Sequence, residues 1–292
     1  MMKMKKIAAL ALCLALCTLM LAGCGGSAGQ SGGSASQSGE DVLIVATSPD
    51  FAPTTFVDTS KEGQDQYVGF DIAVAQYIAD QMGKTLVIQP MSFDACTTAV
   101  SMGTVDMALA GFAWREDRAE NFNLSNEYSP SDDPNLDRQV IITLKDKEGQ
   151  FTTPADFAGV KVGVQTASLQ ESLCREQLPD CELVIIGDLG TGLLQLKNGD
   201  FACMASAYPT AEVFMNNDPD IALAGFDFEV DDTGTVVVMQ KGADELTAKV
   251  NEILAKAAEE GLMGGWYAEA VELAKSATAS EVTFDDSGNA AS

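Results

Sequence analysis

The sequence of 292 residues contains no histidine, and its basic residues are scarce: Lys and Arg number 17, against 43 Asp and Glu. Without an imidazole there can be no Ser-His-Asp or Cys-His nucleophile, no histidine metal ligand and no imidazole proton shuttle. The net charge of −26 argues against nucleic acid as a partner, because few cations could neutralise phosphates, and against electrostatic adhesion to anionic lipid. These absences exclude several classes of enzyme, and the sequence assigns no catalytic residue, metal ligand or cofactor.

The residues that are present fit a globular protein. Hydrophobic residues make up 46% of the chain, which is typical of folded domains rather than of disordered or fibrous chains. The length allows one large domain or two ordinary ones.

The N-terminal segment has the pattern of an export signal. Three lysines within the first six residues precede an apolar run at 7–22, which is too short for a comfortable membrane span. The run ends in a Leu-Ala-Gly-Cys motif at Cys24. This motif resembles the lipobox of bacterial lipoproteins, which are cut before the cysteine and carry a diacylglycerol on its thiol. We expect a lipoprotein signal peptide at 1–23 and Cys24 as the lipid anchor; an ordinary signal peptide with a chance cysteine is the alternative.

Two further segments lack the composition of a folded core. Residues 25–40 are almost entirely Gly, Ser, Ala and Gln, so 24–40 is expected to be a flexible tether. The small, polar tail at 276–292 is expected to be disordered. Removal of the signal would leave 14 basic against 43 acidic residues, a net charge of −29.

Four cysteines would remain after processing, besides the anchor: Cys96, Cys174, Cys181 and Cys203. Disulfides form in exported proteins, and only Cys174 and Cys181 are close in sequence. Their spacing permits a bridge but does not require one. Cys96 and Cys203 lie in apolar contexts and are expected to be small core residues.

Strands and helices alternate in the same order twice. The first unit predicts strands at 42–47, 85–90 and 105–110 with helices at 71–83 and 93–102, and the second predicts strands at 160–164, 183–187 and 201–205 with helices at 168–177 and 189–197. A strand at 235–240 and helices at 244–259 and 264–274 follow. The repeated β-α-β-α-β order predicts two doubly wound parallel sheets.

This α/β pattern predicts two lobes joined by two hinge strands, near 138–144 and 233–238. Lobe 1 would contain 41–137 and 234–275, and lobe 2 would contain 138–233. Open parallel sheets bind ligands beyond the carboxyl ends of their strands. Five segments would therefore meet in one cleft: 47–56, 91–94, 111–118, 165–169 and 206–209.

Aromatic residues stand at three of these strand ends. Phe51, Phe93 and Trp114 together favour a ligand-stacking pocket, although core packing is the alternative for each and the favoured interpretation for Phe56.

Arg118 and Ser168 are candidates for binding an anion. The planar guanidinium of Arg118 suits a carboxylate, although an ion pair with Glu116 or Glu120 is equally compatible with the sequence. Ser168 and Glu171 have the spacing of a capping box. The free amide groups at that helix start would suit an anion, or the motif is only a cap.

Four segments carry a resemblance to a known family: Tyr67–Ile72, Pro90–Phe93, Val105–Gly111 and Lys161–Gln165. They resemble the family-3 extracellular solute-binding proteins, the polar amino-acid receptors of ABC importers typified by the glutamine- and histidine-binding proteins. The resemblance runs in order from about 42 to 275. It implies the periplasmic-binding-protein-like fold of the second type, in which two lobes close over one ligand.

By position, the resemblance implies that Phe51 and Phe93 stack on the ligand and that Arg118 binds its α-carboxylate. The Gly111 carbonyl would accept from the α-ammonium. The residues implied to close from the second lobe are Gln165 and Ser168.

The chain also departs from the family pattern. Ala113 replaces a usual Ser or Thr, and Ala207 replaces the Asp that usually binds the α-ammonium. Thr54 and Thr55 replace a usual Phe-Glu pair. Either a nearby acid such as Asp50 or Asp132 substitutes, or the ligand is not a standard α-amino acid.

The leading hypothesis is a monomeric, lipid-anchored extracytoplasmic receptor on a bacterial cell membrane. It would bind a small carboxylate solute, with a polar amino acid favoured, and deliver it to an ABC permease. The alternatives are a cyclohexadienyl-dehydratase-like enzyme on the same fold and a sensor without transport.

Overall fold

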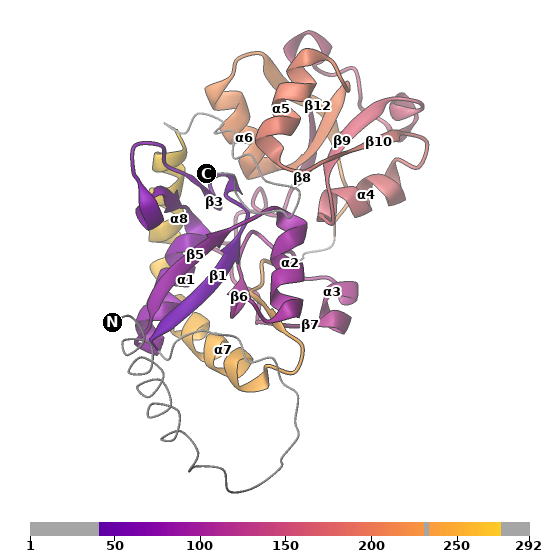
Figure 1. Ribbon diagram of the computed structural model, residues 1–292. Coiled ribbons are helices and arrows are strands. Elements are labelled where there is room, and N and C mark those ends of the chain that lie inside the picture. The colour runs from indigo at the N-terminus through magenta and orange to yellow at the C-terminus, as the bar shows by residue number, and fades with distance from the viewer. Residues whose placement is uncertain (1–40, 231–233, 276–292) are drawn as a thin grey trace, which may run out of the picture. The chain divides into compact units, whose positions relative to one another are not determined.

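The computed structural model describes residues 41–230 and 234–275 (Figure 1). The expected signal peptide, lipid anchor, tether and tail, and the first residue of the second expected hinge strand, lie outside the described residues: 1–23, Cys24, 24–40, 276–292 and 233.

The first sheet contains five strands in the order β5-β1-β6-β13-β7. They are β1 (Val42–Thr47), β5 (Thr85–Pro90), β6 (Met107–Ala108), β7 (Phe122–Leu124) and β13 (Val238–Gln240). Strand β1 is parallel to β5 and β6, whereas β13 is antiparallel to β6 and β7. One face is covered by α1 (Phe70–Met82), α7 (Asp244–Glu259) and α8 (Leu262–Ala274), and the other by α2 (Phe93–Met102).

The second sheet also contains five strands, in the order β10-β9-β11-β8-β12. They are β8 (Gln139–Leu144), β9 (Lys161–Gln165), β10 (Glu182–Ile186), β11 (Cys203–Ala207) and β12 (Ile221–Asp227). Helix α4 (Leu169–Gln177) packs on one face, and α5 (Leu189–Asn198) and α6 (Tyr208–Asn217) pack on the other (Figure 1).

Smaller elements connect these layers. A three-stranded sheet is formed by β2 (Asp50–Phe51), β3 (Thr55–Val57) and β4 (Tyr67–Val68). The short helix α3 covers Glu116–Asn121, and 3-10 turns lie at Gly63–Gln66, Lys145–Lys147 and Pro154–Phe157. No helix among the described residues is both long and apolar enough to cross a membrane.

The predicted α/β architecture with helices on both faces of each sheet is confirmed, but the prediction that both sheets are parallel is wrong. Strands β8 and β12 are antiparallel to their neighbours in the second sheet, as β13 is in the first. The chain enters β8 from the first sheet and β13 from the second. Neither strand follows a helical crossover within its own sheet, and only that kind of connection enforces a parallel neighbour.

The strand expected at 105–110 is also much shorter than expected, because β6 contains only Met107 and Ala108. Immediately before it, the Asp106 carboxylate accepts from the Ile44 backbone N–H at 2.7 Å. A side chain thus satisfies a donor that a longer strand would have paired.

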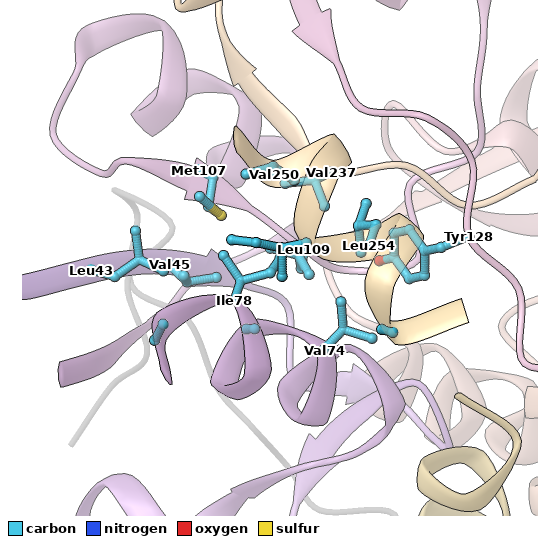
Figure 2. Close-up of a cluster of buried hydrophobic side chains, with 14 of the residues drawn as sticks. Leu43, Val45, Val74, Ile78, Met107, Leu109, Tyr128, Val237, Val250 and Leu254 are labelled. Atoms are coloured by element: carbon cyan, nitrogen blue, oxygen red, sulfur yellow. The ribbon is translucent and has the colours of Figure 1, made fainter. Parts of the chain in front are cut away.

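Alternating side chains of β1 serve the two faces of the first sheet. Leu43 and Val45 are buried against Val74 and Ile78 of α1 in the cluster shown in Figure 2, whereas Ala46 belongs to the cluster on the α2 face. This is the two-residue period of a strand buried on both faces.

Cysteines contribute to the cores as thiols. The four cysteines of the described residues are free, so the structure contains no bridge between Cys174 and Cys181. Cys174 is fully buried in the cluster on the α4 face, where half-buried Cys181 also packs, and burial raises the pKa of both thiols. Cys96 and Cys203 are fully buried, as expected of small core residues.

Gly69, at the start of α1, fixes the approach of that helix to the β2–β3 turn. Its φ is 127°, and a Cβ there would lie 2.4 Å from the backbone oxygen of Thr54, which accepts from Asp71 N at 2.9 Å. Because this obstacle is backbone, it cannot rotate away. We expect Gly69→Ala to lower the free energy of unfolding by about 3 kcal/mol or more, measured by urea denaturation.

Gly83→Ala at the other end of α1 is the matched control. Its φ is 68°, but no atom lies within 4 Å of the added Cβ. Only the cost of a left-handed backbone for a residue with a Cβ applies, about 1 to 2 kcal/mol. Equal losses in the two variants would contradict the steric argument.

Candidate functional site

One pocket is lined by residues that belong to both sheets and to the loops at their strand ends. All five segments expected to meet there contribute to it. The lining residues are Phe51, Thr54, Phe93, Ala110, Gly111, Ala113, Arg118, Leu136, Asp137, Gln139, Gln165, Ser168, Leu169, Gln170, Ala207, Pro209 and Thr235. The rule that open sheets bind beyond the carboxyl ends of their strands therefore located the pocket.

The structure brings together seven of the eight residues proposed from the sequence as ligand-binding: Phe51, Phe93, Gly111, Ala113, Arg118, Gln165 and Ser168. Trp114 is not among the lining residues and is 40% exposed. Its neighbour Ala113 pairs with Thr235 in an isolated antiparallel bridge. Successive side chains of extended backbone point to opposite sides, which places Ala113 at the pocket and Trp114 at the surface.

Arg118 is a buried cation supported by aromatic rings. It lies in α3, is only 8% exposed, and its guanidinium carbon is 5.0 Å from the centroid of Phe112. Phe112 in turn stacks on Phe93 with centroids 4.6 Å apart. Arg118 Nη1 donates to the Ala113 carbonyl.

No carboxylate lies within 4.0 Å of the Arg118 guanidinium among the described residues. The ion pair that the sequence allowed with Glu116 or Glu120 does not form. Burial, together with nearby Arg115, lowers the pKa of Arg118 from 12.5 to about 10. The side chain therefore stays charged at neutral pH, and the negative charge of Asp117 acts on it from beyond ion-pair distance.

Gly111 packs closely against an aromatic wall of the pocket. Its φ is 65°, and a Cβ would lie 2.6 Å from Cε1 of Phe51. Its backbone N–H donates to the fully buried Asp71 carboxylate at 2.7 Å, and Tyr128 Oη donates to the other oxygen at 2.8 Å. Burial raises the pKa of Asp71 from 3.8 to about 6.

The second sheet contributes polar groups to the pocket. Ser168 caps α4, because its Oγ accepts from Glu171 N at 3.1 Å, which confirms the cap. The reciprocal bond of a capping box does not form, because the Glu171 carboxylate accepts from Ala167 N at 2.8 Å instead. The Ser168 carbonyl accepts from Arg115 Nη1, on the first-sheet side, at 3.1 Å. Gln170 Nε2 donates to Gln139 Oε1 at 2.6 Å.

Sequence reasoning missed several polar lining residues, chiefly Asp137, Gln139 and Gln170. Asp137 and Gln139 lie where the chain passes from the first sheet to the second, and no strand-end rule applies there. Gln170 sits inside the recognised capping motif, so its helix position was the available signal. Ala207 lines the pocket, as its place in the family pattern implied, and Asp132 lines a different surface hollow.

Among the described residues, no group of three or more Cys, Asp or Glu side chains is arranged to hold a metal ion. The pocket combines one buried cation, Arg118, with one carboxylate, Asp137, and several side-chain amides. This set suits a small solute that carries a carboxylate and hydrogen-bonding groups.

Comparisons with known sequences point to one family. Residues 43–269 match the bacterial extracellular solute-binding proteins, family 3. The arginine-binding extracellular protein ArtP of Bacillus subtilis (strain 168) is 30% identical over 227 residues, which cover 75% of this chain and 82% of that protein. The cyclohexadienyl dehydratase of Pseudomonas aeruginosa is 28% identical over 160 residues, or 54% of this chain and 56% of that protein.

A solved structure agrees with this result. The amino acid ABC transporter substrate-binding protein AbpA from Streptococcus pneumoniae, bound to L-arginine, superposes with a TM-score of 0.75 at 30% identity, covering 82% of this chain and 98% of that one. The fold is thus that of the type II periplasmic binding proteins. The chain belongs to the bacterial extracellular solute-binding proteins, family 3.

Proposed function

We propose that this protein is the receptor of an ABC importer and that it captures an amino acid by its α-carboxylate. Arg118 carries the proposal, because its buried guanidinium lines the pocket and forms no ion pair with a carboxylate of the described residues, so it can bind an anion from outside. The relatives ArtP and AbpA, which are named for arginine binding or bound to L-arginine, support an amino acid as the ligand. The amides of Gln139 and Gln170 favour one with a polar side chain.

Binding is proposed to act through conformation. The two sheets would be the cores of two lobes, 41–137 with 234–275 and 138–233, joined where the chain crosses between them. A solute that contacts both lobes stabilises the closed arrangement by its differential affinity, and a permease reads that arrangement. The Leu-Ala-Gly-Cys motif supports attachment to a bacterial membrane through a lipid on Cys24.

A calorimetric and thermal-shift screen of the twenty L-amino acids tests this function. At least one should bind, and at 100 times its dissociation constant it should add about 2.7 kcal/mol to the free energy of unfolding. The methyl ester of the same amino acid, which lacks the carboxylate but keeps the side chain, is the matched control and should give no shift. A screen in which no amino acid raises the melting temperature would remove the proposal.

The similarity to a cyclohexadienyl dehydratase supports a second candidate, an enzyme that eliminates water from a prephenate-like acid. Such a reaction needs a positioned acid, and the family's acid at position 207 is alanine here. Loss of prephenate during incubation with the protein, followed by absorbance, would favour this candidate over the receptor.

A further inference from the structure

Asp50 joins parts of the chain that belong to different sheets. It lies in β2, and its Oδ2 accepts from Gln165 Nε2 at 2.9 Å and from the backbone N–H of Leu189 at 2.8 Å. Gln165 ends β9 and Leu189 begins α5, both beside the second sheet. Asp50 Oδ1 accepts from Ser48 Oγ at 2.6 Å. No basic side chain lies within 4.0 Å of this carboxylate in the described part of the chain.

This contact fixes the orientation of the Gln165 amide. An ionised carboxylate can only accept hydrogen bonds, so Gln165 must turn its NH₂ group toward Asp50. Gln165 lines the pocket, and no described residue donates to its Oε1. The amide oxygen is therefore the end of Gln165 that is open to a donor from outside the chain.

An acceptor at this place would give the pocket a partner for the ammonium group of an amino acid. Arg118 supplies the partner for a carboxylate, but the side chain of Ala207 offers no acceptor to an ammonium group, so a Gln165 oxygen would add an acceptor to the Asp137 carboxylate that also lines the pocket. On the basis of the proposed function, we propose that Asp50 is a positioning residue for specificity. It holds Gln165 so that the amide oxygen faces the ammonium group of the bound amino acid. Through the same carboxylate oxygen, Asp50 also connects β9 and α5 to β2.

Protonation of Asp50 would undo this arrangement. Burial and the nearby negative charge of Asp188 raise the pKa of Asp50 to about 6, against the opposing hydrogen bonds from Ser48 and Leu189. A protonated Asp50 can donate, so the Gln165 amide can turn its oxygen away from the solute and toward Asp50. The other ionisable groups facing this region are Asp188 beside α5, and Cys96 and Asp94 on α2; burial raises the pKa of the Cys96 thiol well above 9, so it stays neutral.

The test compares two ligands that differ in one group, L-arginine and its deamino analogue 5-guanidinopentanoate. If the amino-acid screen selects another residue, the selected amino acid and its own deamino analogue replace them. Calorimetry at pH 7.5 and pH 5.0 gives the dissociation constant of each ligand. The constant of the deamino analogue divided by that of the amino acid measures recognition of the ammonium group. In the wild type this ratio should fall by up to about 10-fold on acidification, because about one-tenth of a group with a pKa of about 6 is still ionised at pH 5.0 and a hydrogen bond to a charged group contributes at least that much affinity.

Asp50→Asn should give the lower ratio at both pH values, because a neutral amide no longer forces Gln165 to donate. Gln165→Leu, which leaves Asp50 in place, should do the same and covers the case in which the first variant fails to fold. Asp65→Asn, at an exposed carboxylate, should keep the wild-type ratio and its pH dependence.

The outcomes separate this proposal from the function on which it rests. A wild type that binds no amino acid overturns both. A wild type that binds, but whose ratio is the same at pH 5.0 and 7.5 or is unchanged by Asp50→Asn and by Gln165→Leu, overturns the role of Asp50 alone.

Discussion

Replacing Arg118 with alanine is expected to weaken the binding of every carboxylate solute by about 100-fold or more, while the protein remains folded. Truncating one partner of a buried, hydrogen-bonded charge pair removes about 2 to 5 kcal/mol of binding free energy. Arg118 is 8% exposed, so solvent would screen its interaction with a bound carboxylate very little.

The same substitution should leave the melting temperature within a few degrees of the wild type. Burial, together with the positive charge of Arg115 and against the negative charge of Asp117, lowers the pKa of Arg118 from 12.5 to about 10, which corresponds to about 3 kcal/mol of unfavourable free energy in the folded protein. Removing the charge removes this unfavourable free energy of burial, and this gain offsets the loss of the contact with the Phe112 ring. Stability is thereby exchanged for affinity at this position.

Arg175→Ala is the matched control for Arg118→Ala. Arg175 forms an exposed pair with Glu171 on α4, with its Nη2 2.7 Å from a carboxylate oxygen. Exposed pairs contribute less than about 1 kcal/mol, so neither affinity nor stability should change greatly. Because the pKa of Arg118 is about 10, its contribution to ligand affinity should not change between pH 5 and pH 8. Any pH dependence of the affinity in that range must come from other groups. Undiminished affinity of Arg118→Ala for an amino acid would refute its role.

The regular part of the fold was accessible from the sequence for identifiable reasons. The apolar segments of β1, β5, α1 and α2 are continuous or periodic, and three helices end at glycines with left-handed backbone, Gly83, Gly103 and Gly199. Helix α6 was missed although Pro209 in its first turn is a start signal. The small β2–β3–β4 sheet was missed because strands of two or three residues carry no measurable period.

The sequence predicted those residues of the site that lie at the ends of strands, but not the directions of their side chains or the contacts between distant segments. The strand-end rule placed Phe51, Phe93 and Arg118 at one pocket. It could not decide the side-chain direction of Trp114, which depends on how the 113–114 segment pairs with residue 235. Nor could it find the Asp50–Gln165 contact, since 115 residues separate these two side chains and only the packing of β2 against the second sheet brings them together.

Replacing Asp71 with alanine is expected to lower the free energy of unfolding by about 2 to 5 kcal/mol at pH 5. The buried Asp71 carboxyl group holds both Gly111 N and Tyr128 Oη, and alanine would leave these two buried groups unpaired. The loss can be measured by urea denaturation. Amino-acid affinity should fall with it, because Gly111 belongs to the pocket.

The pH dependence of this loss has a definite sign. The pKa of Asp71 in the folded protein is about 6, above its ordinary value of 3.8. The folded state therefore holds the proton more tightly than the unfolded state. The stabilising contribution of this proton linkage to the free energy of unfolding is complete below pH 3.8 and is lost as the pH rises through 6. Between pH 5 and pH 8 this linkage should remove about 1 to 2 kcal/mol of stability from the wild type.

Asp71→Asn isolates that linkage, because its amide resembles the protonated acid: the oxygen can accept from Gly111 N while the NH₂ group donates to Tyr128 Oη. This variant should lack the Asp71 component of the pH profile and should be more stable relative to the wild type at pH 8 than at pH 5. Asp80→Asn removes one negative charge from the exposed side of the same helix and should keep the wild-type profile. If both variants changed the profile equally, general repulsion among the acidic residues, and not the buried carboxyl group, would be its cause.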